Sequence, residues 1–197
     1  MDMIIKIIIV IISYLLGSIP FSYIIGRLKG VNLLEVGSKN AGATNVYRNL
    51  GLAYALMAFL LDVGKGYFAM LLGKVFFVDQ YSFIVLCGLA AILGHTFTPF
   101  LKFKGGKGVA TGIGILLFIN PVIAIAAFAL GISIILSTRY VSLGSIISSL
   151  FVLAMSLLPY FKMPTEYQIF ICIAVVYIIY KHVPNIKRLL IGQENKV

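Results

Sequence analysis

Apolar segments alternate with short polar stretches along almost the whole chain. The apolar segments cover residues 3–26, 52–72, 82–101, 109–119, 121–137, 140–158 and 167–180. A helix of about 20 apolar residues crosses the hydrocarbon core of a bilayer, and in lipid a helix satisfies its own backbone hydrogen bonds. The pattern therefore predicts an all-α, polytopic membrane helix bundle with seven transmembrane helices, in a single domain over residues 1–197.

Asn120 and Pro121 divide the long apolar stretch between residues 109 and 137. Proline favours the first turn of a helix and disfavours helix at the residue before it, so we expect one helix to end and another to begin here. If the pair were only a kink, the number of spans would be six. The 109–119 helix would cover only about half of a ~30 Å core, which places its start below the membrane surface, next to a cavity or buried backbone.

Positive charge is distributed unevenly between the two sides of this bundle. The chain has 16 lysines and arginines, six acids and a net charge of +10. With seven spans, one side carries Arg27, Lys29, Lys39, Arg48, Lys102, Lys104, Lys107, Arg139, Lys181, Lys187, Arg188 and Lys196. Cytoplasmic loops carry the excess of Lys and Arg, so we expect the N-terminus outside and the C-terminus in the cytoplasm. The charges are loop charges of a membrane protein, and we expect no nucleic-acid partner.

Three polar segments stand out, and this topology places all three on the cytoplasmic side. They are residues 37–48 (the first polar segment), 102–108 (the second) and 181–188 (the third). Each lacks acids and is built largely from Gly, Lys, Arg, Ser, Thr and Asn, the residues that hold phosphate groups. The pattern indicates a protein that handles a phosphorylated, water-soluble substrate at a bilayer surface.

The second polar segment carries the sharpest signal, because it ends in a glycine-rich loop directly before a short helix. We call residues 104–108 the glycine loop; it contains Lys104, Gly105, Gly106, Lys107 and Gly108. Glycines allow backbone amides to approach an anion, and a helix start adds unpaired amides and the positive end of a dipole. The spacing is not that of a Walker loop. A flexible, positively charged turn is the alternative.

The first polar segment has many hydrogen-bond donors and no hydrophobic period. Its candidate pocket residues are Ser38, Asn40, Thr44, Asn45 and Arg48. Small residues between them would permit close approach of the backbone to a ligand. A polar loop that only joins two spans is the alternative interpretation.

His182 in the third polar segment precedes Asn185 by three residues. Beside two anion-binding segments, His182 becomes a candidate general base, hydroxyl-orienting group or phosphate ligand, whereas alone it would be read as a helix cap. We expect His95 to have a structural hydrogen-bonding role. Asp62 and Lys65, three residues apart within a span, predict a buried ion pair with a possible contact to the site.

The chain has few residues of the kinds that bind catalytic metals. Six acids, two separated histidines and two cysteines within apolar runs do not suggest a two-metal or zinc site. Neither His95 nor His182 has an aspartate five residues further on, which argues against the His-x4-Asp acyltransferases that use thioesters. We therefore expect no metal and no cofactor, and catalysis by positioning and positive charge.

Together, these motifs resemble the bacterial acyl-phosphate:glycerol-3-phosphate acyltransferases, integral membrane enzymes that make lysophosphatidic acid. The similar stretches are residues 15–20, 37–48, 61–66, 93–95, 104–111, 139–142 and 182–194. The resemblance implies a seven-span fold with its motifs meeting at the cytoplasmic side. It also implies a place in phospholipid biosynthesis at the bacterial inner membrane.

The resemblance also implies roles for particular residues. Ser38 and Arg48 correspond to essential residues, Gly105, Gly106, Lys107 and Gly108 to the loop that binds the phosphate of glycerol 3-phosphate, and His182 and Asn185 to the third motif. Thr44, Asn45 and Ser142 are expected to contact substrate. The chain departs from the family at Lys39, where a glycine is common, and at Val183 and Pro184, where Arg and Glu are common.

The expected reaction transfers a fatty acyl group from an acyl phosphate to the 1-hydroxyl of glycerol 3-phosphate. The partners are these two substrates and membrane lipid; the sequence leaves the oligomeric state open and is compatible with a monomer. A transporter for an organic phosphate is the alternative, because the short 109–119 helix resembles the broken helices of transporters. Against it, the sequence shows no repeat, and the polar groups gather on one side.

Overall fold

The computed structural model describes residues 2–197, and all regular secondary structure in that range is helical. Its elements in chain order are α1 (Asp2–Ser18), α2 (Phe21–Leu28), α3 (Ala43–Leu50), α4 (Leu52–Phe76), α5 (Tyr81–Thr96), η1 (Pro99–Leu101), α6 (Val109–Ile119), α7 (Pro121–Thr138), α8 (Val141–Ser156), η2 (Pro159–Phe161) and α9 (Thr165–Leu190). The chain forms two compact units, the first ending at Phe118 and the second running from Ile119 to Val197.

Five stretches within residues 2–197 are long and apolar enough to cross a membrane. They are Asp2–Leu28, Leu52–Phe76, Tyr81–Leu101, Pro121–Thr138 and Thr165–Leu190, and the shorter apolar helices are Val109–Ile119 and Val141–Ser156. The outer face of α1 exposes a row of isoleucines, as a lipid-facing surface does. The prediction of an all-α protein with several membrane spans is confirmed, and the number seven stays a prediction.

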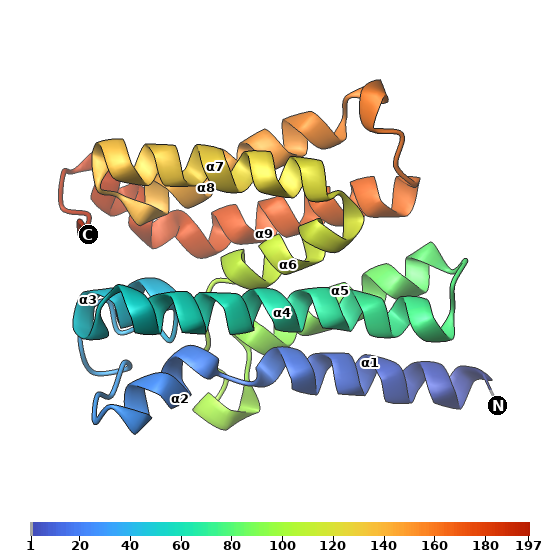
Figure 1. Cartoon of the computed structure of the whole chain (residues 1–197), viewed down its shortest axis with the longest axis horizontal. Coiled ribbons are helices and arrows are strands. Elements are labelled where there is room, and N and C mark those ends of the chain that lie inside the picture. Colours follow the sequence, from blue (N-terminus) through green and yellow to red (C-terminus); the bar gives the residue numbers. More distant parts are fainter. Residues whose placement is uncertain (1) are drawn as a thin grey trace. The chain divides into compact units, whose positions relative to one another are not determined.

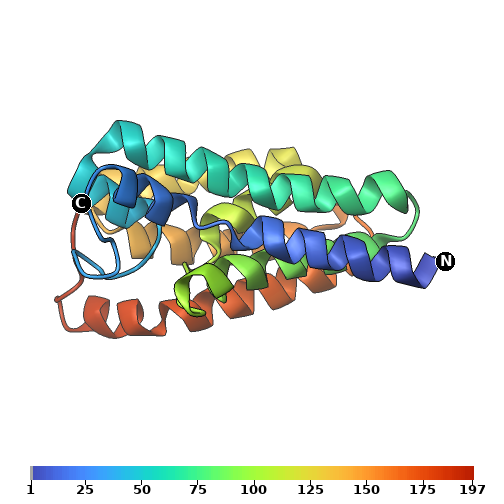
Figure 2. The ribbon, with the colours of Figure 1, turned by 90° about the horizontal axis from the view of Figure 1, so that it is seen from below.

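In the first unit, α1 and α4 each lie along α5, and α3 packs on α4 (Figure 1). Figure 2 shows this unit from below, with α2 continuing from α1 beyond a short break. Small residues permit the close helix approaches: a side chain at Gly17 would overlap the backbone of Ala91, and one at Gly94 would overlap the carbonyl of Tyr14.

The predicted span over residues 3–26 corresponds to one candidate span, Asp2–Leu28, and a break between α1 and α2 interrupts the helix within it. α1 ends at Ser18, and α2 begins at Phe21 after Pro20, which has no backbone N–H to donate. Side chains from other parts of this unit donate to the carbonyls at the break: Thr98, between α5 and η1, donates to the carbonyl of Ser18 at 2.7 Å, and Lys65 of α4 to that of Ile19 at 2.9 Å. The apolar run hid this break because hydropathy is high on both sides of it.

In the second unit, α8 packs against both α7 and α9 (Figure 1). The expected division at residues 120 and 121 is confirmed: the Asn120 side chain accepts from the amide of Ile123 at 3.1 Å, and Pro121 occupies the first turn of α7. The predicted apolar span over residues 167–180 lies within the last helix, which extends into the polar tail. α9 continues to Leu190, with Pro184 inside it, because the change to polar residues marks the end of the apolar layer and not of the helix.

Candidate active site

The glycine loop is fastened to the C-terminal end of α5. The amide of Gly105 donates to the carbonyl of Thr96 at 2.9 Å, and that of Gly106 to the carbonyl of His95 at 3.1 Å. The last carbonyls of a helix have no hydrogen-bond donor within that helix. These two bonds therefore supply donors to the end of α5 and also fix the position of the loop. The two amides that seemed available for an anion are therefore used inside the protein.

The glycines at 105 and 106 are required by what lies beneath them. A Cβ at Gly105 would overlap the carbonyl oxygen of His95, and a Cβ at Gly106 would overlap its imidazole Nε2. Gly108 has a φ of +85°, in the region that favours glycine, and turns the chain into α6. The loop thus lies directly on His95, which the sequence did not reveal.

The amides that can face an anion come at the start of α6. Gly112 makes the first backward hydrogen bond there, from its amide to the carbonyl of Gly108 at 2.7 Å. The preceding amides of the first turn have no acceptor within the helix. The half-buried Lys107 lies directly before this turn, and Lys104 is exposed. A lysine next to a helix start is a combination that can bind an anion, so this turn remains the candidate phosphate site.

Asn45 organises the first polar segment from within. It is 1% exposed, and its Oδ1 accepts from the Ser38 amide at 3.0 Å. Its Nδ2 donates to the carbonyls of Leu33 at 2.8 Å and Val36 at 3.0 Å. The side-chain amide of Asn45 thus shapes the loop, and its predicted contact with substrate stays a prediction.

The other candidates of this segment remain accessible. Ser38 is exposed, and Asn40, Thr44 and Arg48 are half-buried. Thr44 and Arg48 are four residues apart on α3, so they share one face of that helix. Lys39, which replaces a glycine of the family motif, has a φ of +54°, so this non-glycine residue holds the left-handed conformation that glycine adopts without strain.

The third polar segment presents His182 and Asn185 on one buried face of α9. His182 Nδ1 lies 2.8 Å from the carbonyl oxygen of Ile178. A carbonyl only accepts, so the Nδ1 carries the proton, and Nε2 is the acceptor nitrogen of the neutral ring. That tautomer is the one a general base or a hydroxyl-orienting group requires.

Glu194 joins Asn185 to Ser142, a connection that the sequence did not indicate. Its Oε1 accepts from Ser142 Oγ at 2.8 Å and from Asn185 Nδ2 at 2.6 Å, and its Oε2 from Arg188 Nε at 2.7 Å. Burial raises the pKa of this carboxyl, but the hydrogen bonds from Asn185, Ser142 and Arg188 outweigh it, so the pKa lies below its ordinary value. The one signal in the sequence was a lone acid in a basic tail.

Asp62 and Lys65 form the buried ion pair that their spacing predicted, at 2.7 Å. His95 Nδ1 lies 3.7 Å from the same carboxylate oxygen. All three side chains are nearly inaccessible. His95 joins this cluster to the glycine loop, because its ring also lies against Gly106.

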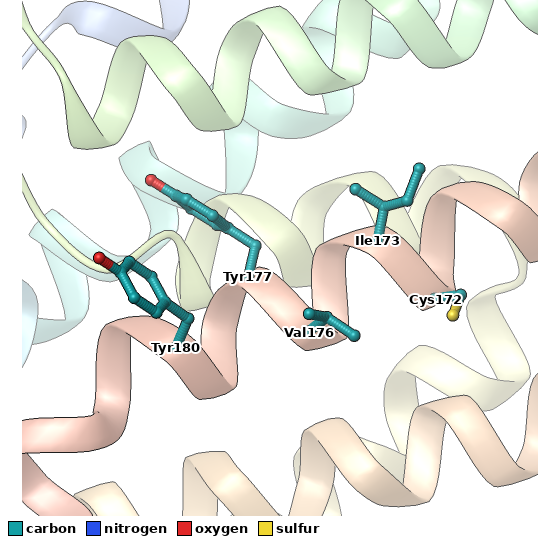
Figure 3. Close-up of a pocket in the computed structure, with 5 residues that line it drawn as sticks. All are labelled: Cys172, Ile173, Val176, Tyr177 and Tyr180. Carbon is teal, nitrogen blue, oxygen red and sulfur yellow. The ribbon is translucent and has the colours of Figure 1, made fainter.

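An apolar pocket of about 440 Å³ lies along α9 (Figure 3). It is lined by Cys172, Ile173, Val176, Tyr177 and Tyr180. The last of these directly precedes the third polar segment in the chain. An aliphatic chain would lose its contact with water in such a pocket.

Comparison with known proteins shows the family of this chain. The family model "Glycerol-3-phosphate acyltransferase" matches residues 7–192. Glycerol-3-phosphate acyltransferases of Fusobacterium nucleatum and Aquifex aeolicus are 42% and 43% identical, with 95% of this chain covered in both and 95% and 96% of theirs.

Two crystal structures of PlsY (YgiH), an integral membrane glycerol 3-phosphate acyltransferase, are also similar, each with 40% identity. The glycerol 3-phosphate form has a TM-score of 0.90, covering 98% of this chain and 95% of that one. The lysophosphatidic acid form has a TM-score of 0.88, covering 97% and 94%. Identity and coverage of this extent show that the chain belongs to the glycerol-3-phosphate acyltransferase family.

Proposed function

We propose that this protein transfers a fatty acyl group from an acyl phosphate to the 1-hydroxyl of glycerol 3-phosphate. The products are 1-acyl-glycerol 3-phosphate and inorganic phosphate. The observation that carries the proposal is the glycine loop, in which Lys107 directly precedes the first turn of α6, whose amides have no acceptor within the helix. The relatives crystallised in glycerol 3-phosphate and lysophosphatidic acid forms support the same acceptor and product.

In the proposed reaction, the hydroxyl oxygen bonds to the acyl carbonyl carbon. The bond from that carbon to the phosphate oxygen breaks, and phosphate leaves with the electron pair. Phosphate is a good leaving group, so no strong general acid is required. The hydroxyl proton passes either to Nε2 of His182 or to a phosphate oxygen of the substrate.

Positive charge supplies most of the assistance in this scheme. Lys107, Arg48 and the amides at the start of α6 hold the two phosphates and reduce their mutual repulsion, while Ser38 contributes a further donor. His182 and Asn185 orient the acceptor hydroxyl, and Glu194 holds Asn185. The acyl chain lies between helices or in lipid, and the apolar pocket on α9 is one place for it.

The proposal includes the topology. The chain acts as a single domain with seven spans in the bacterial inner membrane, and its three polar segments face the cytoplasm, where glycerol 3-phosphate is available. The short α6 counts as one of these spans.

Product formation by purified protein in detergent tests the donor. Glycerol 3-phosphate is supplied with palmitoyl phosphate or with palmitoyl-CoA, with a chelator present throughout. We expect lysophosphatidate from the acyl phosphate alone. Product only from the thioester would overturn the donor assignment, and no product from either, in folded protein, would favour the organic phosphate transporter and lead to flux assays in liposomes.

A further inference from the structure

Three ionisable side chains, Asp62 and Lys65 of α4 and His95 of α5, are buried within membrane-spanning helices. Their exposed fractions are 2%, 3% and 8%. Ionisable groups within a membrane are costly and persist where they pair or serve a function. Their pairing, at 2.7 Å for Asp62 with Lys65 and 3.7 Å for Asp62 with His95, leaves open why the cluster includes a histidine.

His95 connects this cluster to the glycine loop. One edge of its imidazole, Nδ1, faces Asp62. The opposite edge, Nε2, lies so close to the α-carbon of Gly106 that no Cβ fits between them. The carbonyl of the same residue accepts the Gly106 amide. The ring is thus held between the carboxylate and the loop.

α4 also supports the helix that follows the loop. A Cβ at Gly66 would overlap the carbonyl of Thr111, and one at Gly114 would overlap the carbonyl of Val63. The turn of α4 that carries the buried ion pair therefore contacts the first turn of α6. The loop thus contacts α5 through His95, and the helix that follows the loop contacts α4.

We propose that His95, oriented by Asp62, is a positioning residue for the anion-binding loop. It does not touch substrate; its ring fixes the path of residues 105–108 and so the direction of Lys107 and of the amides at the start of α6. The inference rests on the proposed function, because it assigns the loop to the phosphate of glycerol 3-phosphate. Its consequence is that Gly106 is required only while the imidazole is present.

A double-mutant cycle tests this. In His95→Asn, the amide keeps a polar atom toward Asp62 but vacates the place of Nε2. We expect Gly106→Ala alone to raise KM for glycerol 3-phosphate about tenfold with a smaller change in kcat, since coupled neighbours show interaction energies equivalent to such factors. In the His95→Asn background, the same change should raise KM less than about twofold.

Gly64→Ala, on α4, is the matched control, because it also replaces a glycine by alanine. Its Cβ would meet only the ring of Phe68 at 3.8 Å. KM and kcat should remain those of the wild type. His95→Gln should preserve more affinity than His95→Ala if a polar atom near Nε2 matters for the loop.

The outcomes separate this inference from the function on which it rests. Equal effects of Gly106→Ala in both backgrounds would overturn the positioning role, and so would a loss confined to kcat. If Gly106→Ala does not fold, His95→Asn must restore folding, and failure to do so also refutes the role. If the wild type makes no product, the proposed function fails. The positioning role is then tested with the same variants by measuring how far glycerol 3-phosphate raises the unfolding midpoint of each.

Discussion

Asp62 and Glu194 are both buried carboxylates that support candidate site segments, but their partners come from different distances along the chain. Asp62 pairs with Lys65, three residues on in the same helix. Glu194 accepts from Ser142, 52 residues before it, and from Asn185 and Arg188 on α9. The first support is local and lies within a membrane span; the second depends on a tail that folds back.

The difference has consequences for how each support fails. Loss of the Asp62 charge leaves the Lys65 ammonium, which is 3% exposed, without its carboxylate partner, whereas Arg188, the charged partner of Glu194, is 39% exposed. We therefore expect changes at Asp62 to affect folding and changes at Glu194 to affect mainly activity. The predictions below test that contrast.

The largest expected effect is that of Asp62→Asn on folding. Removing one partner of a buried ion pair costs about 3–5 kcal/mol, because the other charge is left uncompensated. The unfolding midpoint in detergent and the yield of folded protein should both fall sharply. The double variant Asp62→Asn with Lys65→Met should recover part of the lost stability. If its unfolding midpoint were no higher than that of Asp62→Asn alone, the uncompensated Lys65 charge would not be the cause of the loss.

Lys107→Ala should spare the fold and remove activity. Loss of one preorganised charge that stabilises the transition state lowers the rate by on the order of a hundredfold or more. We expect the same for Arg48→Ala, with unfolding midpoints near that of the wild type. Arg27→Ala removes an exposed charge on α2 and serves as the control. Full rates from folded Lys107→Ala and Arg48→Ala proteins would contradict the site assignment.

Glu194→Gln should have a smaller effect on stability and reduce turnover. A hydrogen bond to a charged group contributes about 2 kcal/mol, and the amide keeps one acceptor oxygen. We expect kcat to fall about tenfold as Asn185 loses its orientation, a loss equivalent to 1.4 kcal/mol. A change confined to the unfolding midpoint would show that Glu194 supports only the fold.

The pH dependence follows from the same carboxyl. Its pKa in the folded protein is below the ordinary value of 4.5, so its stabilising contribution is complete above that pH and is lost as the pH falls through the folded pKa. The difference in unfolding midpoint between the wild type and Glu194→Gln should be constant near neutrality and shrink below pH 4.5. A difference that persists in acid would contradict this.

The smallest effect is expected at Lys39. Its left-handed backbone costs a non-glycine residue about 1 kcal/mol, so Lys39→Gly should raise the unfolding midpoint slightly. Lys187→Gly, within α9, should lower the midpoint by a similar amount, because glycine weakens a helix. If both variants shifted the unfolding midpoint equally and in the same direction, the effect of Lys39→Gly would not come from backbone strain at Lys39.

Features that depend on neighbours in sequence were predictable. The bounds of α6, the division at Asn120 and Pro121 and the pair of Asp62 with Lys65 all follow from hydropathy, proline chemistry and helical spacing. The candidate residues around the glycine loop were proposed from their types alone, and their assignment to a site stays a prediction. Their individual roles did not follow, because Gly105 and Gly106 donate inward and Asn45 is used within its own loop.

What the sequence by itself determined is an apolar, helical membrane protein with three basic, glycine- and amide-rich segments, because hydrophobic burial and helix periodicity act over a few residues. Only the tertiary structure decided which groups support those segments: Thr98 and Lys65 at the break after α1, His95 under Gly106, and Glu194 between Ser142 and Asn185. Such hydrogen bonds join residues far apart in the chain. Their geometry is fixed by packing, which no local pattern specifies.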